Sequence, residues 1–185
     1  MNEKPVRHRP PNDPLRRKRI IDAALVAIKQ YGVSAVTHRR IAEIAEVPLG
    51  SLTYYFSGLD QIIGEAFKAL ASTVLSRFST LLEQAVDTAH ARAAIVDFLT
   101  SEHKQDQAEL LAVFELYAGS IRHSELRSVV TDWMTGSRAA MERHFSPRQA
   151  RALDALIEGV MIHNLANPGL ISRDEIAEII DRLTA

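Results

Sequence analysis

The chain of 185 residues contains no cysteine, and this absence excludes disulfide bonds and thiolate metal sites. A reducing cytoplasm is therefore the expected location. No stretch reaches the roughly 18 consecutive apolar residues of a membrane-spanning helix, so no membrane span is expected. The first residues are rich in Arg and Pro and contain no apolar run, which argues against a secretory signal. Glycine and proline are scarce after residue 60, and no segment alternates polar and apolar residues for long, so strands are not expected.

The net charge is small, but the charges are unevenly distributed. Residues 1–40 contain ten Lys and Arg against three Asp and Glu, a net charge of +7. Residues 41–185 contain twelve against twenty, a net charge of −8, so the whole chain carries −1. A basic first part on an acidic body predicts a polyanionic partner that binds at one end only. A basic tail without a partner is the alternative.

The spacing of apolar residues predicts an all-α fold. Residues 1–12 hold three of the seven prolines and are expected to form a disordered basic arm. Thr37, Ser146 and Ser172 are predicted helix N-caps, and Ser57 with Asp60 is a predicted capping box. The predicted helices are 13–31, 38–45, 48–55, 57–85, 89–103, 106–121, 124–144, 147–166 and 173–183. The fourth helix would be on the order of 40 Å long, enough to connect two domains.

The stretch Thr37–Phe56, THRRIAEIAEVPLGSLTYYF, predicts two short helices joined by a tight turn. One small apolar face would hold the two helices together, formed by Ile41, Ala42, Ala45, Val47 and Leu52. The outward positions carry two arginines and short polar or aromatic side chains, which suit a groove floor bounded by phosphates. The stretch therefore predicts a helix-turn-helix that binds DNA.

Residues 37–63 resemble the TetR family of bacterial transcriptional regulators. The residues that carry the resemblance are Thr37, Arg39, Ile41-Ala42, Ala45, Val47, Gly50-Ser51-Leu52, Tyr55-Phe56 and Ile62-Ile63. The resemblance implies an N-terminal three-helix domain at 13–58, joined by the long helix to a helical effector-binding and dimerisation domain at 59–185. Three residues depart from the family's pattern. Glu46 replaces the usual turn glycine, at a cost of roughly 1 kcal/mol in a left-handed conformation, Thr53 replaces a tyrosine, and Leu59 replaces a lysine.

The predicted DNA contacts combine base recognition with phosphate binding. The resemblance implies that Arg39 reads a base or clamps a phosphate, and a bidentate contact to guanine would contribute ~1–3 kcal/mol. Arg40 and the two tyrosines are expected at phosphates, and Leu49 at a thymine methyl. The full set is Arg16, Arg17, Lys18, Thr37, Arg39, Arg40, Leu49, Gly50, Ser51, Thr53, Tyr54 and Tyr55. A helix pair packs the same way without DNA, and for Tyr55 core packing is the strongest alternative.

One such unit is too small to select a DNA site, so a homodimer on a palindromic operator is expected. The resemblance implies that the last two helices pair with those of a second copy as a four-helix bundle. The predicted interface residues are Leu153, Leu156, Ile157, Val160, Ile176 and Ile180. The alternative is that these residues close the core of a single chain.

The middle helices predict a largely apolar cavity for a small effector. Its predicted lining is Phe67, Phe98, His103, Phe114, Tyr117, Trp133, Met134, Met141 and His163, with Glu115 and Asn164 as further polar contacts. Plain core packing is the alternative for the aromatic and Met residues, and a core or interface role for His163. The seven histidines show no metal-ligand spacing such as HExxH, so neither a metal nor another cofactor is expected.

Three functions compete. The absence of a GxSxG, P-loop, GxGxxG or paired-carboxylate signature argues against an enzyme. A helical adaptor or small-molecule carrier would bind DNA weakly, without sequence preference, and only at low salt. The favoured hypothesis is a dimeric, ligand-responsive transcriptional regulator, expected to be a repressor.

Overall fold

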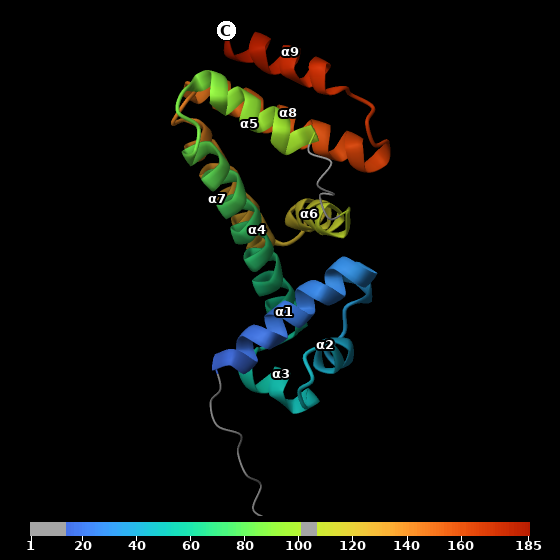
Figure 1. The fold of residues 1–185 in the computed structure, drawn as a ribbon. Coiled ribbons are helices and arrows are strands. Elements are labelled where there is room, and N and C mark those ends of the chain that lie inside the picture. The colour runs from blue at the N-terminus through green and yellow to red at the C-terminus, as the bar shows by residue number, and fades with distance from the viewer. Residues whose placement is uncertain (1–13, 101–106) are drawn as a thin grey trace, which may run out of the picture.

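The computed structural model describes residues 14–100 and 107–185, and the regular elements of these ranges are all helical (Figure 1). The first elements are α1 (Pro14–Tyr31), the 3-10 turn η1 (Val33–Ala35), α2 (His38–Ile44) and α3 (Leu49–Tyr55). They are followed by α4 (Leu59–Glu83), α5 (Thr88–Thr100), α6 (Gln107–Ser120), α7 (Ser124–Met141), α8 (Pro147–Ala166) and α9 (Arg173–Thr184). The predicted all-α fold is confirmed. The predicted arm at 1–12 and His103 lie outside the described residues.

The lower end of the molecule in Figure 1 is formed by α1, α2 and α3. Ile20 and Ile28 on α1 lie on one face of that helix and are buried together with Ile41 of α2 and Leu52 of α3. Gly32 ends α1 in a left-handed conformation, and its N–H donates to Ile28 O at 2.8 Å. Burial of these apolar side chains holds the two short helices against the longer one.

The long helix α4 rises from this end and packs along α7 (Figure 1). Its predicted capping box is wrong because the helix begins one residue later, at Leu59, with Gly58 as the N-cap. The third helical residue is therefore Gln61, and its Oε1 accepts from the Ser57 N–H at 2.7 Å and from Ser57 Oγ at 3.0 Å. Asp60 remains in the first turn, where its charge favours the helix dipole.

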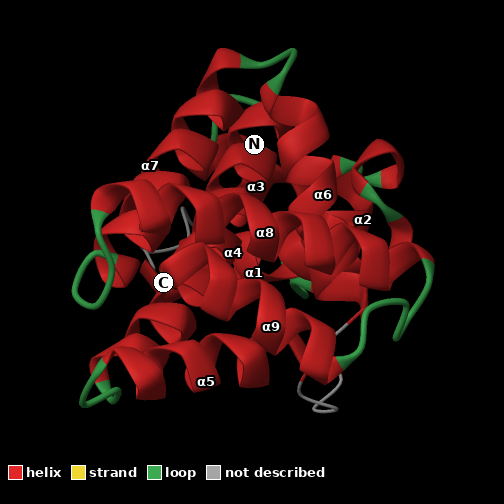
Figure 2. Ribbon diagram, turned by 90° about the horizontal axis from the view of Figure 1, so that it is seen from above, coloured by secondary structure: helices red, strands yellow, loops and turns green. Residues whose placement is uncertain are grey.

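The upper end is a layer of α5, α8 and α9, seen from above in Figure 2. Arg92 of α5 fastens the end of α9 by donating to Thr184 Oγ1 at 2.7 Å and Thr184 O at 2.8 Å. Both α8 and α9 begin with a capping box, Ser146 with Gln149 and Ser172 with Glu175. The predicted caps at Thr37, Ser146 and Ser172 are therefore confirmed.

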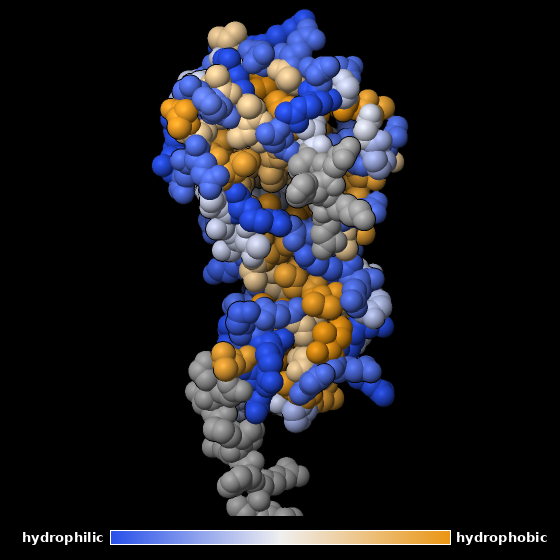
Figure 3. All heavy atoms as spheres, in the orientation of Figure 1, coloured by the Kyte–Doolittle hydropathy of each residue, from blue (hydrophilic) through white to orange (hydrophobic). Residues whose placement is uncertain are grey.

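Two hydrophobic clusters fill the molecule. The upper one joins the ends of α4 and α7 to α5, α8 and α9. The lower one unites α1–α3 with α4 and with Leu116 of α6 and Trp133 of α7. Figure 3 shows hydrophobic surface at the narrow middle of the molecule, between its lower and upper ends. The lower end thus shares its core with α6 and α7 and is not held by α4 alone.

Candidate DNA-binding and effector sites

The turn between α2 and α3 is built as the sequence predicts. Thr37 Oγ1 accepts from the Arg40 N–H at 3.2 Å and caps α2. The chain then turns at Glu46, whose φ of 53° lies in the left-handed region that glycine favours. The Val47 N–H closes the turn by donating to Ala42 O at 3.0 Å. The predicted left-handed Glu46 is confirmed.

The face of α3 that points away from the core is exposed. Leu49 is 54% exposed and Tyr54 is 56% exposed, although both are large and partly apolar. Gly50 lies on the same exposed surface, and a Cβ built there would meet nothing within 4 Å. Arg39 on α2 is exposed and makes no side-chain hydrogen bond or ion pair among the described residues. Internal packing explains none of these four residue choices.

Three of the predicted DNA contacts face inward or hold the protein itself. Ser51 is only 7% exposed and belongs to the packed side of α3, so it does not point into a groove. Tyr55 is half-buried against the core with its ring 4.9 Å from that of Tyr54, as its packing alternative predicts. Arg40 donates to Ala35 O, and its guanidinium lies 4.4 Å from the centre of the Tyr31 ring. Arg40 therefore fastens α2 to the end of α1.

The cations of α1 also have internal partners. Arg17 Nη2 lies 3.2 Å from Glu65 Oε1 of α4, and its guanidinium stacks over Phe56 at 5.0 Å. Lys18 Nζ lies 2.6 Å from Asp22 Oδ2, one turn along the same helix. Arg16 is half-buried. A DNA phosphate would have to compete with these carboxylates for Arg17 and Lys18.

The apolar and aromatic residues of the predicted effector set that the structure describes are divided between the two hydrophobic clusters. Phe67 and Met141 are fully buried, the first in the lower cluster and the second in the upper one. Phe98 packs against Phe78 with ring centres 5.2 Å apart, and His163 is exposed. Phe67, Phe98 and Met141 thus follow the packing alternative, whereas the exposed His163 does not lie in the core. Phe114, Tyr117, Trp133 and Met134 do lie together, where α6 meets α7.

Beside this aromatic cluster lies a carboxylate that the sequence analysis did not single out. Tyr117 Oη donates to Glu158 Oε1 at 2.7 Å, while Glu158 Oε2 is buried without a hydrogen-bond partner. Burial raises the pKa of Glu158, the Tyr117 hydrogen bond lowers it, and the Asp154 carboxylate raises it further. Burial and the Glu158 charge also raise the pKa of Tyr117. Glu158 interrupts the apolar repeat of α8 one turn after Asp154, and this was the signal available in the sequence.

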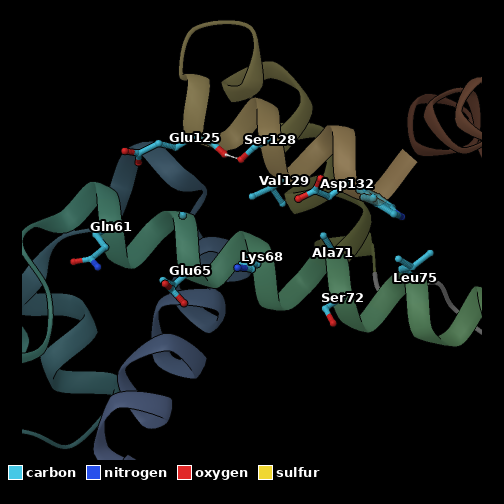
Figure 4. Close-up of a pocket in the computed structure, with 12 residues that line it drawn as sticks. Gln61, Glu65, Lys68, Ala71, Ser72, Leu75, Glu125, Ser128, Val129 and Asp132 are labelled. Carbon is cyan, nitrogen blue, oxygen red and sulfur yellow. Dashed lines mark hydrogen bonds between the residues drawn. The ribbon is translucent and has the colours of Figure 1, made fainter. Parts of the chain in front are cut away.

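A groove of about 370 Å³ runs between α4 and α7 (Figure 4). Leu75 and Trp133 contribute apolar surface to it, and Glu65, Glu125 and Asp132 place three carboxylates along it. A smaller cavity of about 210 Å³ lies beneath α6 and includes Phe67 and Glu115. Among the predicted effector residues that the structure describes, Trp133 lines the groove, and Phe67 and the polar contact Glu115 line the smaller cavity.

The predicted dimer residues are placed mostly inside one chain. Leu153, Ile157, Val160, Ile176 and Ile180 are at most 7% exposed and form the upper cluster, as the alternative predicts. Leu156 is half-buried. The apolar side chains that α8 and α9 leave at the surface are Ile162, Ile179 and Leu183, which are 36–47% exposed. These three residues, and not the five buried ones, are the large apolar side chains that α8 and α9 present to solvent.

Two further expectations concern metals and membranes. Among the described residues, no group of three or more His, Asp or Glu side chains is arranged to hold a metal ion. No helix in the described ranges is long and apolar enough to cross a membrane.

Comparison with known proteins identifies the fold. Residues 20–66 match the family described as bacterial regulatory proteins of the tetR family, and residues 83–185 match a tetracyclin repressor-like C-terminal domain. The chain belongs to the TetR family. The helix-turn-helix followed by a helical C-terminal domain is therefore the arrangement of this family, and the resemblance carried by residues 37–63 is confirmed.

The relatives support the same identification. A crystal structure of a proposed transcriptional regulator, SCO7518 from Streptomyces coelicolor A3(2), is 39% identical with a TM-score of 0.87, covering 93% of this chain and 99% of that one. The multidrug binding protein EbrR, crystallised with ethidium, is 29% identical with a TM-score of 0.78, covering 92% and 99%. The nicotine-responsive transcriptional repressor HdnoR of Paenarthrobacter nicotinovorans is 24% identical and covers 83% and 85%. This TetR-family chain is a DNA-binding transcriptional regulator, and its family is regulatory rather than enzymatic.

Proposed function

We propose that the chain represses transcription as a homodimer that binds a palindromic operator and is released by a small, largely apolar effector. The carrying observation is the exposed face of Arg39, Leu49, Gly50 and Tyr54, on a helix pair that is firmly packed from behind. Residues 13–58 would supply DNA binding, and residues 59–185 effector binding and dimerisation. The cytoplasm is the proposed location, and no catalytic step is proposed.

Each residue of this face has a chemical role at DNA. Arg39 supplies the unpaired guanidinium that can bind guanine through two hydrogen bonds. Leu49 offers an apolar surface to a thymine methyl, and Gly50 lets the backbone approach the groove because no side chain intervenes. Tyr54 can donate its hydroxyl to a phosphate, which positions the helix without specifying sequence.

The effector is proposed to act on the helices that share the lower core. The related EbrR binds ethidium, and the related HdnoR is nicotine-responsive. Here α6 and α7 contribute Leu116 and Trp133 to the cluster that also holds α1, α2 and α3. An effector that favours a different placement of α6 or α7 would therefore change the distance between the two recognition helices of a dimer.

The test is selection of bound sequences from a random duplex pool at ~150 mM salt, which suppresses purely electrostatic binding. The expected result is one palindromic motif. Arg39→Ala should weaken binding to it by ~1–3 kcal/mol, while Arg148→Ala, which removes an exposed arginine on α8, should not. Absence of any enriched motif, together with weak binding lost at this salt, would favour the adaptor or carrier function instead.

A further inference from the structure

We propose that Glu115 of α6 is a positioning residue for DNA binding, because its carboxylate holds the connector between α1 and α2. The connector is defined as residues 32–36 and contains η1. It leads directly to Thr37, the N-cap of α2, and α6 lies beside it at the end of α1 (Figure 1). The role goes beyond the proposed function, because it depends neither on an effector nor on repression.

The first observation is the hydrogen bond between Glu115 and the connector. The Val33 N–H donates to Glu115 Oε2 at 2.8 Å. Val33 is the first residue of η1, so its N–H has no acceptor within that turn. A hydrogen bond from a backbone N–H to a carboxylate is among the stronger ones in proteins. Glu115 therefore supplies an acceptor that the connector does not supply itself.

The second observation is the close approach of the carboxylate to Gly32. A Cβ built on Gly32 would lie 2.9 Å from Glu115 Oε1, closer than Cβ atoms approach other heavy atoms in proteins. A side chain at this position would therefore push the carboxylate away. The φ of Gly32, 76°, also lies in the left-handed region that favours glycine. Glycine thus serves two needs here, the turn that ends α1 and the space for the Glu115 carboxylate.

The third observation is a hydrogen bond on the other side of the connector. The Arg40 guanidinium of α2 donates to Ala35 O, so η1 is held by α6 at its first N–H and by α2 at its last carbonyl. Because η1 has only three residues, we expect a shift at one of these contacts to move the other. Arg39, which carries the exposed guanidinium, is the neighbour of Arg40. The path from α6 to Arg39 therefore runs through one short turn.

A second carboxylate of α6, Glu109, makes a different kind of contact. It binds Lys29 Nζ of α1 at 2.8 Å and also Arg77 of α4. Both partners belong to longer helices, and neither lies in the connector or in α2. Loss of Glu109 should therefore loosen the packing of α6, whereas loss of Glu115 should also change the placement of α2.

The test compares Glu115→Gln, which keeps an oxygen acceptor for the Val33 N–H, with Glu115→Leu, which has none. A leucine has room there, because Glu115 borders the cavity of about 210 Å³ beneath α6. Glu115→Leu should lose about tenfold in affinity for the duplex that the wild type selects, and Glu115→Gln less than about threefold. Affinity for a random duplex at the same salt should change equally in the two variants, because both lose the same charge.

The control for general destabilisation is Thr88→Val, far from the connector. It removes the hydrogen bond from Thr88 Oγ1 to His144 O at 3.2 Å, in the upper end of the molecule. This variant should be less stable than the wild type and bind the selected duplex equally well. The comparison separates loss of positioning from loss of stability.

A second measurement needs no DNA. In amide spectra of the free protein, the Val33 N–H should exchange slowly in the wild type and in Glu115→Gln, and like an unprotected amide in Glu115→Leu. The amide signals of Arg39 and Arg40 should move in Glu115→Leu and keep nearly their wild-type positions in Glu115→Gln. These spectra decide the role even if no palindromic motif is selected, so failure of the proposed function is recognised separately.

Two outcomes would overturn the role of Glu115. One is a folded Glu115→Leu variant that binds the selected duplex as tightly as the wild type. The other is an equal loss of affinity in Glu115→Gln, which would assign the effect to the charge and not to the hydrogen bond. Should Glu115→Leu not fold, amide exchange in the wild type decides, and rapid exchange of the Val33 N–H contradicts the inference.

Discussion

At the scale of single residues, Arg39 and Arg40 show how neighbours of one type take different roles. Arg39 is exposed and free of internal partners, while Arg40 holds Ala35 O and the Tyr31 ring. The sequence motif marks both positions equally. Only the path of the chain at the end of α1 decides which guanidinium is available to DNA, and that path depends on tertiary packing.

We predict that Arg40→Ala lowers the free energy of unfolding by ~1 kcal/mol, because a cation–π contact and a hydrogen bond to a carbonyl are lost together. Arg39→Ala should leave the free energy of unfolding unchanged and weaken only DNA binding. Urea denaturation followed by circular dichroism measures both variants. Equal stability of the two variants would contradict the positioning role of Arg40.

Substitution of Glu46 provides a second prediction for the free energy of unfolding. Its left-handed φ of 53° is strained for a residue with a Cβ, so Glu46→Gly should raise the free energy of unfolding by up to ~1 kcal/mol. The matched control is Glu43→Gly, an exposed position with normal helical conformation in α2, which should lose ~1 kcal/mol. Thermal melts of the two variants should therefore shift in opposite directions. A loss of stability in both would show that the turn is not strained.

At the scale of helices, the ion pair between Arg17 of α1 and Glu65 of α4 competes with DNA for the same guanidinium. Glu65→Gln should strengthen operator binding, and the dependence of log affinity on log salt should become steeper by about one phosphate contact. Glu43→Gln removes the same charge from an exposed site on α2 and provides the control for general electrostatics. An identical gain in the two variants would mean that Arg17 is not held back by Glu65.

Glu109 joins three helices, since it binds Lys29 of α1 at 2.8 Å and also Arg77 of α4. Burial raises the pKa of Glu109, but the hydrogen bonds and charges of Lys29 and Arg77 outweigh it and hold the pKa below its usual value. A depressed carboxyl pKa contributes stability above the unfolded pKa, and this stability is lost as pH falls through the folded pKa. Glu109→Gln should therefore cost ~1–2 kcal/mol near neutral pH, and the difference from the wild type should vanish in acid. Urea titrations at several pH values test this, and a pH-independent difference would contradict it.

The helices themselves could largely be predicted from the sequence, because apolar spacing and Ser or Thr caps are local signals. The start of α4 could not be predicted. Gly58 rather than Ser57 is the N-cap, and the Gln61 side chain accepts from the Ser57 N–H, a contact that the sequence does not reveal. The effector residues could not be placed either. Phe67 and Phe114 both lie at apolar positions of their predicted helices. In the structure, Phe67 is fully buried, whereas Phe114 is half-buried at the surface. The burial and the Tyr117 hydrogen bond of Glu158 could not be predicted either, because they depend on how α6 packs against α8.

At the scale of the whole molecule, the two hydrophobic clusters join different sets of helices. The upper cluster is closed by α8 and α9 of the same chain, and Ile157 and Ile176 are buried within it. The lower cluster connects DNA-binding helices to α6 and α7 without an intervening linker. Under the proposed function, a small shift of α6 or α7 would reach the DNA-binding helices, because packed cores move as discrete units rather than deform continuously.

The dimer provides the last prediction. Two-fold pairing of α8 and α9 must use the apolar side chains that remain exposed, and Ile179 and Leu183 lie one turn apart on α9. The double variant Ile179→Glu, Leu183→Glu would bring like charges together across such an interface. Sedimentation should then show a monomer with unchanged helicity, and affinity for the full palindrome should fall to that of a half-site. Val86→Glu, at a position 79% exposed between α4 and α5, should remain dimeric. A double variant that stays dimeric would place the interface on another face of the molecule.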